Sequence, residues 1–293
     1  MNWDLSEFTD KDVVFVGAGK GRAIAGIKEF LETHARINSF TGVDKQLAAD
    51  DPLAFLHDYD QAKTVFIKNE GIPGDELSVP YTTPLQLFFK LIPQTGATTV
   101  GITGTKGKST TTSLTAHILE TAGKHVVLAG NIGISPLIAL DTATRETIFV
   151  LELSSYQLSD LQVSPHISAC LNLYNDHTDW HGSLEGYWEA KHNIMRFAGP
   201  DDVFIYNPEF PELQRWTTNA QCKTIAINPQ DQLDMSQAQL FGDHNRLNAL
   251  IAREIARQFN VTDDIFQAAL NSFQPRLPCG RSPDECGCSG CAP

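Results

Sequence analysis

Residues 100–112 read V-G-I-T-G-T-K-G-K-S-T-T-T, and this stretch decides the fold. The β-branched and apolar residues from Ala97 to Ile102 are typical of a buried parallel strand. Gly104 and Gly107 then allow a tight loop whose backbone N–H groups can point at one anion. From Thr110 onward the spacing of apolar residues predicts a helix, whose N-terminus would face the same anion.

The side chains of this loop suit a polyphosphate and its metal ion. Lys108 supplies a positive charge for the β- and γ-phosphates, and Ser109 supplies a hydroxyl group suited to Mg²⁺. The strict phosphate-loop pattern is not met, because Ile102 stands where its first glycine belongs. A strand-to-helix turn that binds nothing is the alternative. We predict a nucleotide-phosphate site formed by Gly104, Thr105, Lys106, Gly107, Lys108, Ser109 and Thr110.

The composition is that of an ordinary globular protein with an acidic surface. Of 293 residues, 42% are hydrophobic and 19% are charged, and the formal net charge is −13. Such a charge argues against a nucleic-acid partner or an anionic membrane surface. The polar, acidic start is unlike a signal peptide, and no apolar run approaches the roughly 20 residues that span a bilayer. We therefore expect a cytoplasmic protein, and we expect it to be a monomer.

The first part of the chain predicts a Rossmann-like α/β domain over residues 1–95. Strands are expected at 12–16, 35–40 and 64–68, and a helix is expected from near Pro84. Gly17, Gly19 and Gly21 follow the first strand, where a helix N-terminus could hold a diphosphate. Because Arg22 replaces the third glycine of the dinucleotide pattern, a nucleotide ligand and a plain turn stay equally open. The loop at Gly71 follows the third strand, at the sheet edge where ligands bind in such folds.

Residues 96–275 predict a central ATP-binding domain with a mainly parallel sheet. Glu152 ends a buried strand at 148–153, where a carboxylate is costly unless it meets a cation, so we read it as a Mg²⁺ ligand. The alternative is a carboxylate satisfied by nearby backbone. His177 lies on the loop after the strand at 167–173, and its plain interpretation is a polar surface residue. Lys191 falls within an amphipathic helix over 184–197, and a buried lysine loses its charge readily and can react with CO₂.

Two asparagines and a cysteine-rich tail complete the candidate sites. Asn245 and Asn248 are three residues apart on a helix that begins near Gly242, so they share a face. Their amides suit the edge of adenine, but they could equally be helix caps. Residues 276–293 contain Cys279, Cys286, Cys288 and Cys291 without paired C-x-x-C spacing or an apolar pattern. We expect a disordered or non-native tail, with a zinc knuckle as the alternative.

Several stretches in one order resemble the Mur ligases, and most of all the branch that adds D-glutamate. The G-N-I-G and E-L-S-S-Y-Q-L pieces favour that branch, and N-E-G-I-P with V-P-Y-T-T-P-L-Q-L-F resembles its first domain. The similarity covers about residues 10–275. The matching stretches are T-G-T-K-G-K-S-T (103–110), G-N-I-G (130–133), L-E-L-S-S-Y-Q-L (151–158), L-N-L-Y-N-D-H-T-D (171–179), the helix with Lys191, and G-D-H-N-R-L-N-A (242–249).

The resemblance implies an ATP-dependent amide ligase of peptidoglycan precursor synthesis. It would join D-glutamate to UDP-N-acetylmuramoyl-L-alanine through an acyl phosphate, with ATP and two Mg²⁺ ions. Lys191 matches the carbamylated lysine of the family, and Asn131 and Ser154 match substrate-contacting positions. The implied metal ligands are Ser109, Glu152, His177 and carbamylated Lys191; the implied adenine contacts are Asn245 and Asn248; the implied UDP contacts are Gly17, Gly19, Gly21 and Gly71.

Three departures from the family pattern bear on this expectation. Lys106 stands where the family more often has asparagine, and Lys68-Asn69-Glu70 replaces the S-P that usually precedes G-I-P. Past the last central-domain helix the family continues with L-P-H-R and a third domain, whereas here the L-P at 277–278 is followed by Cys279 and Gly280. We therefore expect a ligase that lacks its carboxy-terminal domain, with its activity in doubt. The alternatives are another superfamily ligase, such as folylpolyglutamate synthase or another Mur branch, and a non-catalytic nucleotide-binding fragment. A nicotinamide-dependent oxidoreductase has only the first glycine turn in its support.

Overall fold

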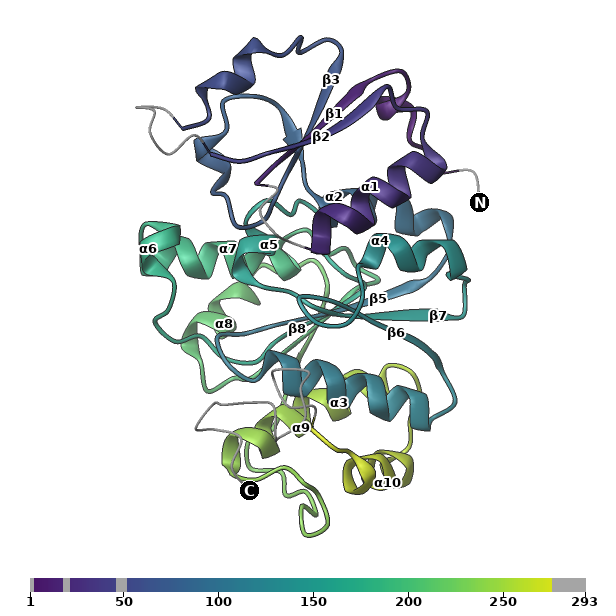
Figure 1. Ribbon diagram of the computed structural model, residues 1–293. Coiled ribbons are helices and arrows are strands. Elements are labelled where there is room, and N and C mark those ends of the chain that lie inside the picture. The colour runs from purple at the N-terminus through teal and green to yellow at the C-terminus, as the bar shows by residue number, and fades with distance from the viewer. Residues whose placement is uncertain (1–2, 18–21, 46–51, 276–293) are drawn as a thin grey trace, which may run out of the picture.

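The computed structural model describes residues 3–17, 22–45 and 52–275 of the chain. Their strands form two separate sheets, stacked one above the other in Figure 1, and every strand pair within them is parallel. In order across the first sheet lie β2 (Ser39–Val43), β1 (Asp12–Val16), β3 (Thr64–Lys68) and β4 (Tyr81–Thr82). In order across the second lie β10 (Lys223–Ala226), β9 (Val203–Tyr206), β8 (Ile167–Cys170), β5 (Thr98–Thr103), β7 (Thr147–Glu152) and β6 (His125–Gly130).

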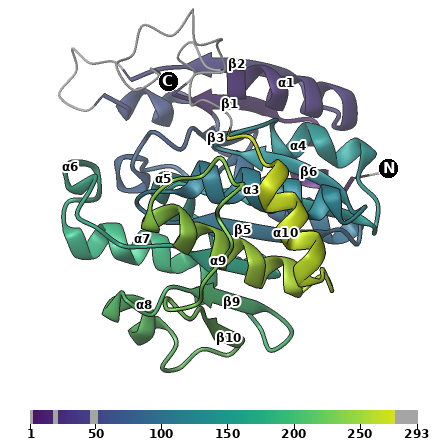
Figure 2. The same ribbon diagram turned by 90° about the horizontal axis from the view of Figure 1, so that it is seen from below.

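Helices cover both faces of the second sheet. One face carries α3 (Lys108–Thr121), α9 (Asp243–Arg257) and α10 (Asp263–Ser272), which lie in front of the strands in Figure 2. Their apolar side chains pack on Val100, Ile102 and Val150 of the central strands. Burial on both faces explains why these strands consist mostly of β-branched and apolar residues. The opposite face carries α2 (Pro84–Leu91), α4 (Pro136–Ala139), α5 (Ser155–Ser159), α7 (Leu184–Arg196) and α8 (Pro211–Trp216), with α6 (Thr178–His181) before α7.

One hydrophobic core joins the two sheets. It contains Phe15 of β1, Phe30 of α1 (Arg22–His34), Phe88 of α2 and Phe149 of β7. The rings of Phe88 and Phe149 meet edge to face with centroids 5.1 Å apart, an arrangement that aromatic pairs prefer. Burial of these side chains stabilises the contact between the sheets, because each removes apolar surface from water. The predicted division at residue 95 lies between α2 and β5, and this shared core runs across it.

The α/β fold class with parallel sheets is confirmed, and most of the predicted elements lie where they were expected. β1 and β3 occupy the predicted ranges, and α2 begins at Pro84 as expected. The strand predicted over 35–40 is wrong, because the observed strand is β2 at Ser39–Val43. The parallel register pairs Ser39 with Asp12, and α1 occupies the chain as far as His34. This edge strand is mostly exposed, so no apolar run marks it in the sequence.

Two of the predictions fall on residues that the structure does not describe, and a third concerns membrane-spanning helices. Gly19, Gly21 and the tail over 276–293 lie outside the described residues. Among the helices of the described part of the chain, none is long and apolar enough to cross a membrane.

Candidate active site

The loop between β5 and α3 takes its shape from two glycines. Gly104 has φ of +155° and Gly107 has φ of +85°, and Gly107 is the residue immediately before α3. A Cβ atom on Gly107 would lie 2.7 Å from Oδ1 of Asn248, a distance that real Cβ atoms do not show. The left-handed backbone and the close approach both require glycine here. The loop therefore presents backbone N–H groups at the start of a long helix, as an anion site does.

Two lysines converge on the carbonyl group of Gly104. Lys108 Nζ donates to the carbonyl oxygens of Gly104 and Thr105, both at 3.0 Å. Lys191 Nζ, from α7, donates to the Gly104 oxygen at 3.0 Å and to Thr103 Oγ1 at 3.3 Å. Burial lowers the pKa of Lys108, and burial aided by the charge of Lys108 lowers the pKa of Lys191 to about 7. At neutral pH a large fraction of the Lys191 amine is therefore uncharged.

Lys191 is enclosed by the elements around the loop. Its side chain is 1% exposed, and Nζ lies 4.9 Å from the ring centroid of Tyr187, one turn earlier on α7. The Tyr187 hydroxyl donates to Thr105 Oγ1 at 3.0 Å, so α7 is tied to the loop at two points. The sequence predicts Lys191 within an amphipathic helix, and in α7 Lys191 is buried on the same side of the helix as Met195.

Glu152 is buried beside the loop, and only one of its two carboxylate oxygens accepts a hydrogen bond from the described residues. It ends β7 opposite Ile102 of β5, and its side chain is 1% exposed. Oε1 accepts a hydrogen bond from Asn131 Nδ2 at 2.9 Å, whereas Oε2 has no hydrogen-bond partner among the described residues. A buried carboxylate oxygen without a donor is costly unless a cation meets it. The arrangement fits a Mg²⁺ ion between Glu152 and the loop, with Ser109 at the start of α3.

His177 lies at the surface of the same edge of the sheet. It is exposed, has φ of +49°, and lies directly before α6. Its Nδ1 is 2.9 Å from the hydroxyl oxygen of Tyr156, and its Nε2 is 3.6 Å from Oδ2 of Asp176. Within the described ranges, no three His, Cys, Asp or Glu side chains are grouped closely enough to hold a metal ion. A second metal site at His177 therefore stays a prediction.

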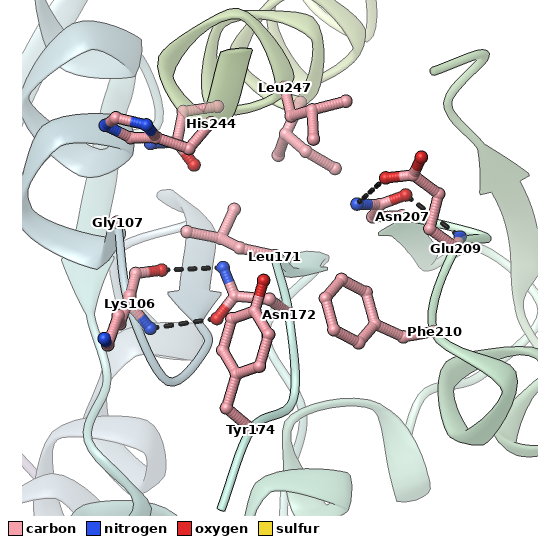
Figure 3. Close-up of a pocket in the computed structure, with 12 residues that line it drawn as sticks. Lys106, Gly107, Leu171, Asn172, Tyr174, Asn207, Glu209, Phe210, His244 and Leu247 are labelled. Atoms are coloured by element: carbon pink, nitrogen blue, oxygen red, sulfur yellow. Dashed lines mark hydrogen bonds between the residues drawn. The ribbon is translucent and has the colours of Figure 1, made fainter. Parts of the chain in front are cut away.

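Asn172 is a loop-shaping residue that the sequence reasoning missed. Its Oδ1 accepts hydrogen bonds from the backbone N–H groups of Thr105 and Lys106, at 3.0 and 2.9 Å. Its Nδ2 donates to the Lys106 carbonyl at 2.9 Å (Figure 3). A signal was available, because Asn172 lies two residues beyond β8, the strand that pairs with β5. An amide at the edge next to the loop can reach it.

A pocket next to the loop has the surroundings of a base-binding site. Figure 3 shows open space between His244 and Leu247 on one side and Tyr174 and Phe210 on the other. The two aromatic rings meet edge to face, with centroids 5.3 Å apart. Flat apolar walls with a few polar groups suit a planar ring system. The remaining lining residues are Lys106, Gly107, Leu171, Asn172, Asn207, Glu209, Asn248 and Ile251.

The two predicted adenine contacts have different surroundings. Asn248 is buried and lines the pocket. Asn245 is not among the lining residues; its Nδ2 donates to the Phe241 carbonyl, and its Oδ1 accepts from Asn248 Nδ2 at 3.2 Å. Asn245 therefore bonds the chain that leads into α9 and also orients Asn248, but it does not cap the helix, which begins after Gly242 without a side-chain cap.

Of the predicted UDP contacts, Gly17 and Gly71 belong to the described residues, and both bond to Asn69. Asn69 Nδ2 donates to the Gly17 carbonyl, and Asn69 Oδ1 accepts from the Gly71 N–H, each at 3.0 Å. Trp180 Nε1, at α6, donates to the Gly71 carbonyl at 3.2 Å. Ser154 begins α5, where its hydroxyl accepts from the Gln157 N–H at 3.2 Å. Gly17, Asn69 and Gly71 thus form the first-domain side of the candidate site, and Trp180 and Ser154 face them from the second domain.

The fold and the site define a nucleotide-binding α/β protein with a phosphate loop. The family model for the Mur ligase middle domain matches residues 102–249. The chain therefore belongs to the Mur ligase family.

Named relatives match almost all of this chain. The UDP-N-acetylmuramoylalanine–D-glutamate ligases of Streptococcus uberis and Streptococcus mutans are 28% and 29% identical to it, over 92% of this chain and 67% of theirs. The chain thus spans about two thirds of the length of these curated relatives. Among solved structures, a UDP-N-acetylmuramate:L-alanyl-gamma-D-glutamyl-meso-diaminopimelate ligase from Neisseria meningitides superposes with a TM-score of 0.62, at 18% identity over 92% of this chain and all of that one. The UDP-N-acetylmuramate-alanine ligase of Thermotoga maritima gives a TM-score of 0.53 at 20% identity, over 90% of this chain and 69% of that one. These two likenesses concern the fold.

Proposed function

We propose that this chain carries the ATP-binding and UDP-substrate-binding parts of an ATP-dependent ligase that joins D-glutamate to UDP-N-acetylmuramoyl-L-alanine. The unpartnered Oε2 of Glu152 carries the proposal, because it is a buried carboxylate oxygen beside a phosphate loop. The names of the relatives support the choice of substrates. We also propose a monomer that works in the cytoplasm.

The residues of the loop divide the work of holding a polyphosphate. Lys108 and the N–H groups at the start of α3 bind its oxygens, and the pocket at Asn248 takes the base. Ser109 and Glu152 hold Mg²⁺, and His177 with the carbamate of Lys191 holds a second ion. When bound, ATP and Mg²⁺ supply the phosphoryl group and the neutralising charge that amide ligation needs. The chain's own task is positioning and charge stabilisation.

A carbamate on Lys191 follows from its surroundings. A pKa of about 7 leaves much of the amine neutral at physiological pH, and only the neutral amine reacts with CO₂. As the nitrogen of the neutral amine bonds the carbon of CO₂ it loses one proton to solvent, and the product is an anion next to Lys108. A metal ion at this place would stabilise the carbamate further.

Binding measurements with one variant and one matched control test the proposal. Lys108→Ala should weaken Mg-ATP binding roughly tenfold or more, since a hydrogen bond to a charged group contributes about 1.5–3 kcal/mol. Lys124→Ala removes an exposed lysine beyond the far end of α3 and should leave the affinity unchanged. Unchanged calorimetric titrations in folded Lys108→Ala protein would contradict the assignment.

The substrate class is tested separately. The wild-type chain should bind UDP-N-acetylmuramoyl-L-alanine and not a folate. Binding of a folate instead would favour the folylpolyglutamate synthase branch of the superfamily.

A further inference from the structure

The segment where this chain departs from the family pattern contains a buried ion pair between the two sheets. Lys68 is the last residue of β3 in the first sheet, and its side chain is fully buried. Its Nζ lies 2.7 Å from Oδ2 of Asp160, whose side chain is 7% exposed. Asp160 follows α5 directly, in the part of the chain that packs on the second sheet. A largely desolvated pair of this kind persists only where the geometry supplies further partners.

Those partners come from both sides of the contact. The Tyr81 hydroxyl donates to Asp160 Oδ1 at 2.8 Å, and Gln86 Nε2 donates to the Asp160 carbonyl at 2.6 Å. Lys68 Nζ also donates to the Ile72 carbonyl at 2.5 Å, and it lies 5.4 Å from the centroid of the Tyr81 ring. The bridge therefore fixes β3 and β4 of the first domain on the carboxylate of Asp160, and α2 is held by the backbone carbonyl of the same residue.

The same bridge fixes the loop over residues 69–74. Lys68 holds the carbonyl of Ile72 within this loop. A Cβ atom on Gly74 would lie 2.3 Å from the Tyr81 hydroxyl oxygen and 2.9 Å from Asp160 Oδ1. The loop backbone is thus packed directly on the ion pair, and a shift of one requires a shift of the other.

A second set of contacts connects this loop to the catalytic edge of the second sheet. Gln157 Nε2 donates to Glu70 Oε1 at 3.3 Å, and Gln157 Oε1 accepts from the Ser154 N–H at 3.0 Å. Burial raises the pKa of Glu70. One side chain therefore joins the loop of the first domain to Ser154, two residues beyond Glu152. Trp180 adds its contact to the Gly71 carbonyl.

We propose that Lys68 is a positioning residue, whose ion pair with Asp160 holds the loop over 69–74 at a fixed place opposite Ser154 and so aligns the two halves of the UDP-substrate site. The inference rests on the proposed function of that site. A bridge that served stability alone would not affect one ligand more than another. Loss of alignment between the domains would weaken binding of the UDP-substrate, which is proposed to contact both domains. It would leave ATP binding unchanged, because the proposed ATP contacts all lie on the second domain.

The test compares two affinities in the full 293-residue chain. Lys68→Met keeps the length of the side chain and removes its charge, and Lys63→Met does the same at an exposed position just before β3. Calorimetric titrations with UDP-N-acetylmuramoyl-L-alanine should show at least a tenfold loss for Lys68→Met, and the Mg-ATP affinity should stay within twofold. Lys63→Met should change neither.

Further variants separate alignment from general damage. Asp160→Asn should cause a similar loss for the UDP-substrate, and the double variant should lose no more than the larger of the two single losses, because both disrupt one pair. Tyr81→Phe is the gentler change if Lys68→Met does not fold, and it should weaken UDP-substrate binding about threefold to fivefold with ATP unaffected.

Distinct outcomes overturn the two proposals. A wild-type chain that does not bind the UDP-substrate overturns the proposed function, and the inference with it. A wild-type chain that binds it, with unchanged affinity in folded Lys68→Met or in Tyr81→Phe, overturns the inference alone. Equal losses for both ligands also overturn it, since they indicate a structural role without alignment.

Discussion

Replacing Asn172 with alanine should weaken nucleotide binding without removing any charged side chain that is proposed to contact the nucleotide. Asn172 makes three hydrogen bonds to the phosphate loop, two to the N–H groups of Thr105 and Lys106 and one to the Lys106 carbonyl. The variant leaves Lys108, Ser109 and both loop glycines in place. Any loss of affinity therefore measures the ordering of the loop.

The structure gives the size of the effect. A hydrogen bond of this kind contributes about 0.5–1.5 kcal/mol net, and Asn172 is only partly buried, so each bond belongs near the lower end. Three bonds then give about 2 kcal/mol. If ATP binding has to restore the loop conformation that these three bonds maintain, the dissociation constant for Mg-ATP rises roughly 30-fold, since each 1.4 kcal/mol is a factor of ten.

Isothermal titration of Mg-ATP into the purified variant measures this change. Asn219→Ala is the matched control, because Asn219 is an exposed asparagine on the distant turn between α8 and β10. The control should bind ATP like the wild type. A folded Asn172→Ala protein with less than a threefold change would refute the idea that this side chain orders the loop.

Two further predictions concern the same loop. With dissolved CO₂ held constant, a ¹³C carbamate signal should already be present near pH 7, because the pKa of Lys191 is lowered from 10.5 to about 7, and it should grow as the pH rises, because each carbamate formed releases a proton; a signal that is absent below pH 9, or one that persists in Lys191→Ala, would argue against it. Gly107→Ala should weaken Mg-ATP binding at least tenfold, whereas Gly123→Ala, also left-handed at φ of +73° but with open space around the new Cβ, should leave calorimetric ATP affinity unchanged; equal affinities of the two folded variants would contradict the steric argument.

The sequence predicts most of the fold because its strongest signals are local. The phosphate loop needs glycines at fixed spacing, and β5 is an apolar run since α3 and α7 cover its two faces. The strand near residue 40 was misplaced for the opposite reason. β2 lies at the edge of its sheet, and its position depends on pairing with β1, 27 residues earlier in register. Single-sequence periodicity does not contain that information.

A residue of the candidate site was predictable from the sequence only where its near neighbours along the chain explain its position. Glu152 was identifiable as a charge at the end of a buried strand, and the structure adds that one of its oxygens lacks a partner among the described residues. The bridge between Lys68 and Asp160 joins residues 92 positions apart, and nothing near either one indicates the other. Lys68 appeared only as a departure from a family motif.

The surroundings of the Gly104 carbonyl explain why Lys191, one of the two lysines that donate to it, loses its proton readily. Both Nζ atoms donate to the same carbonyl oxygen, so two cations would lie close together in a largely dry place. Among the described residues no carboxylate forms an ion pair with either lysine. Lys108 is the less buried of the two and can meet a polyphosphate directly, so its positive charge has a use. Lys191 is enclosed by Tyr187 and the loop, and this burial, aided by the charge of Lys108, lowers its pKa to about 7. The neutral form of the amine is the one that CO₂ can convert into an anionic metal ligand, so the burial and repulsion that lower its pKa also prepare its proposed role.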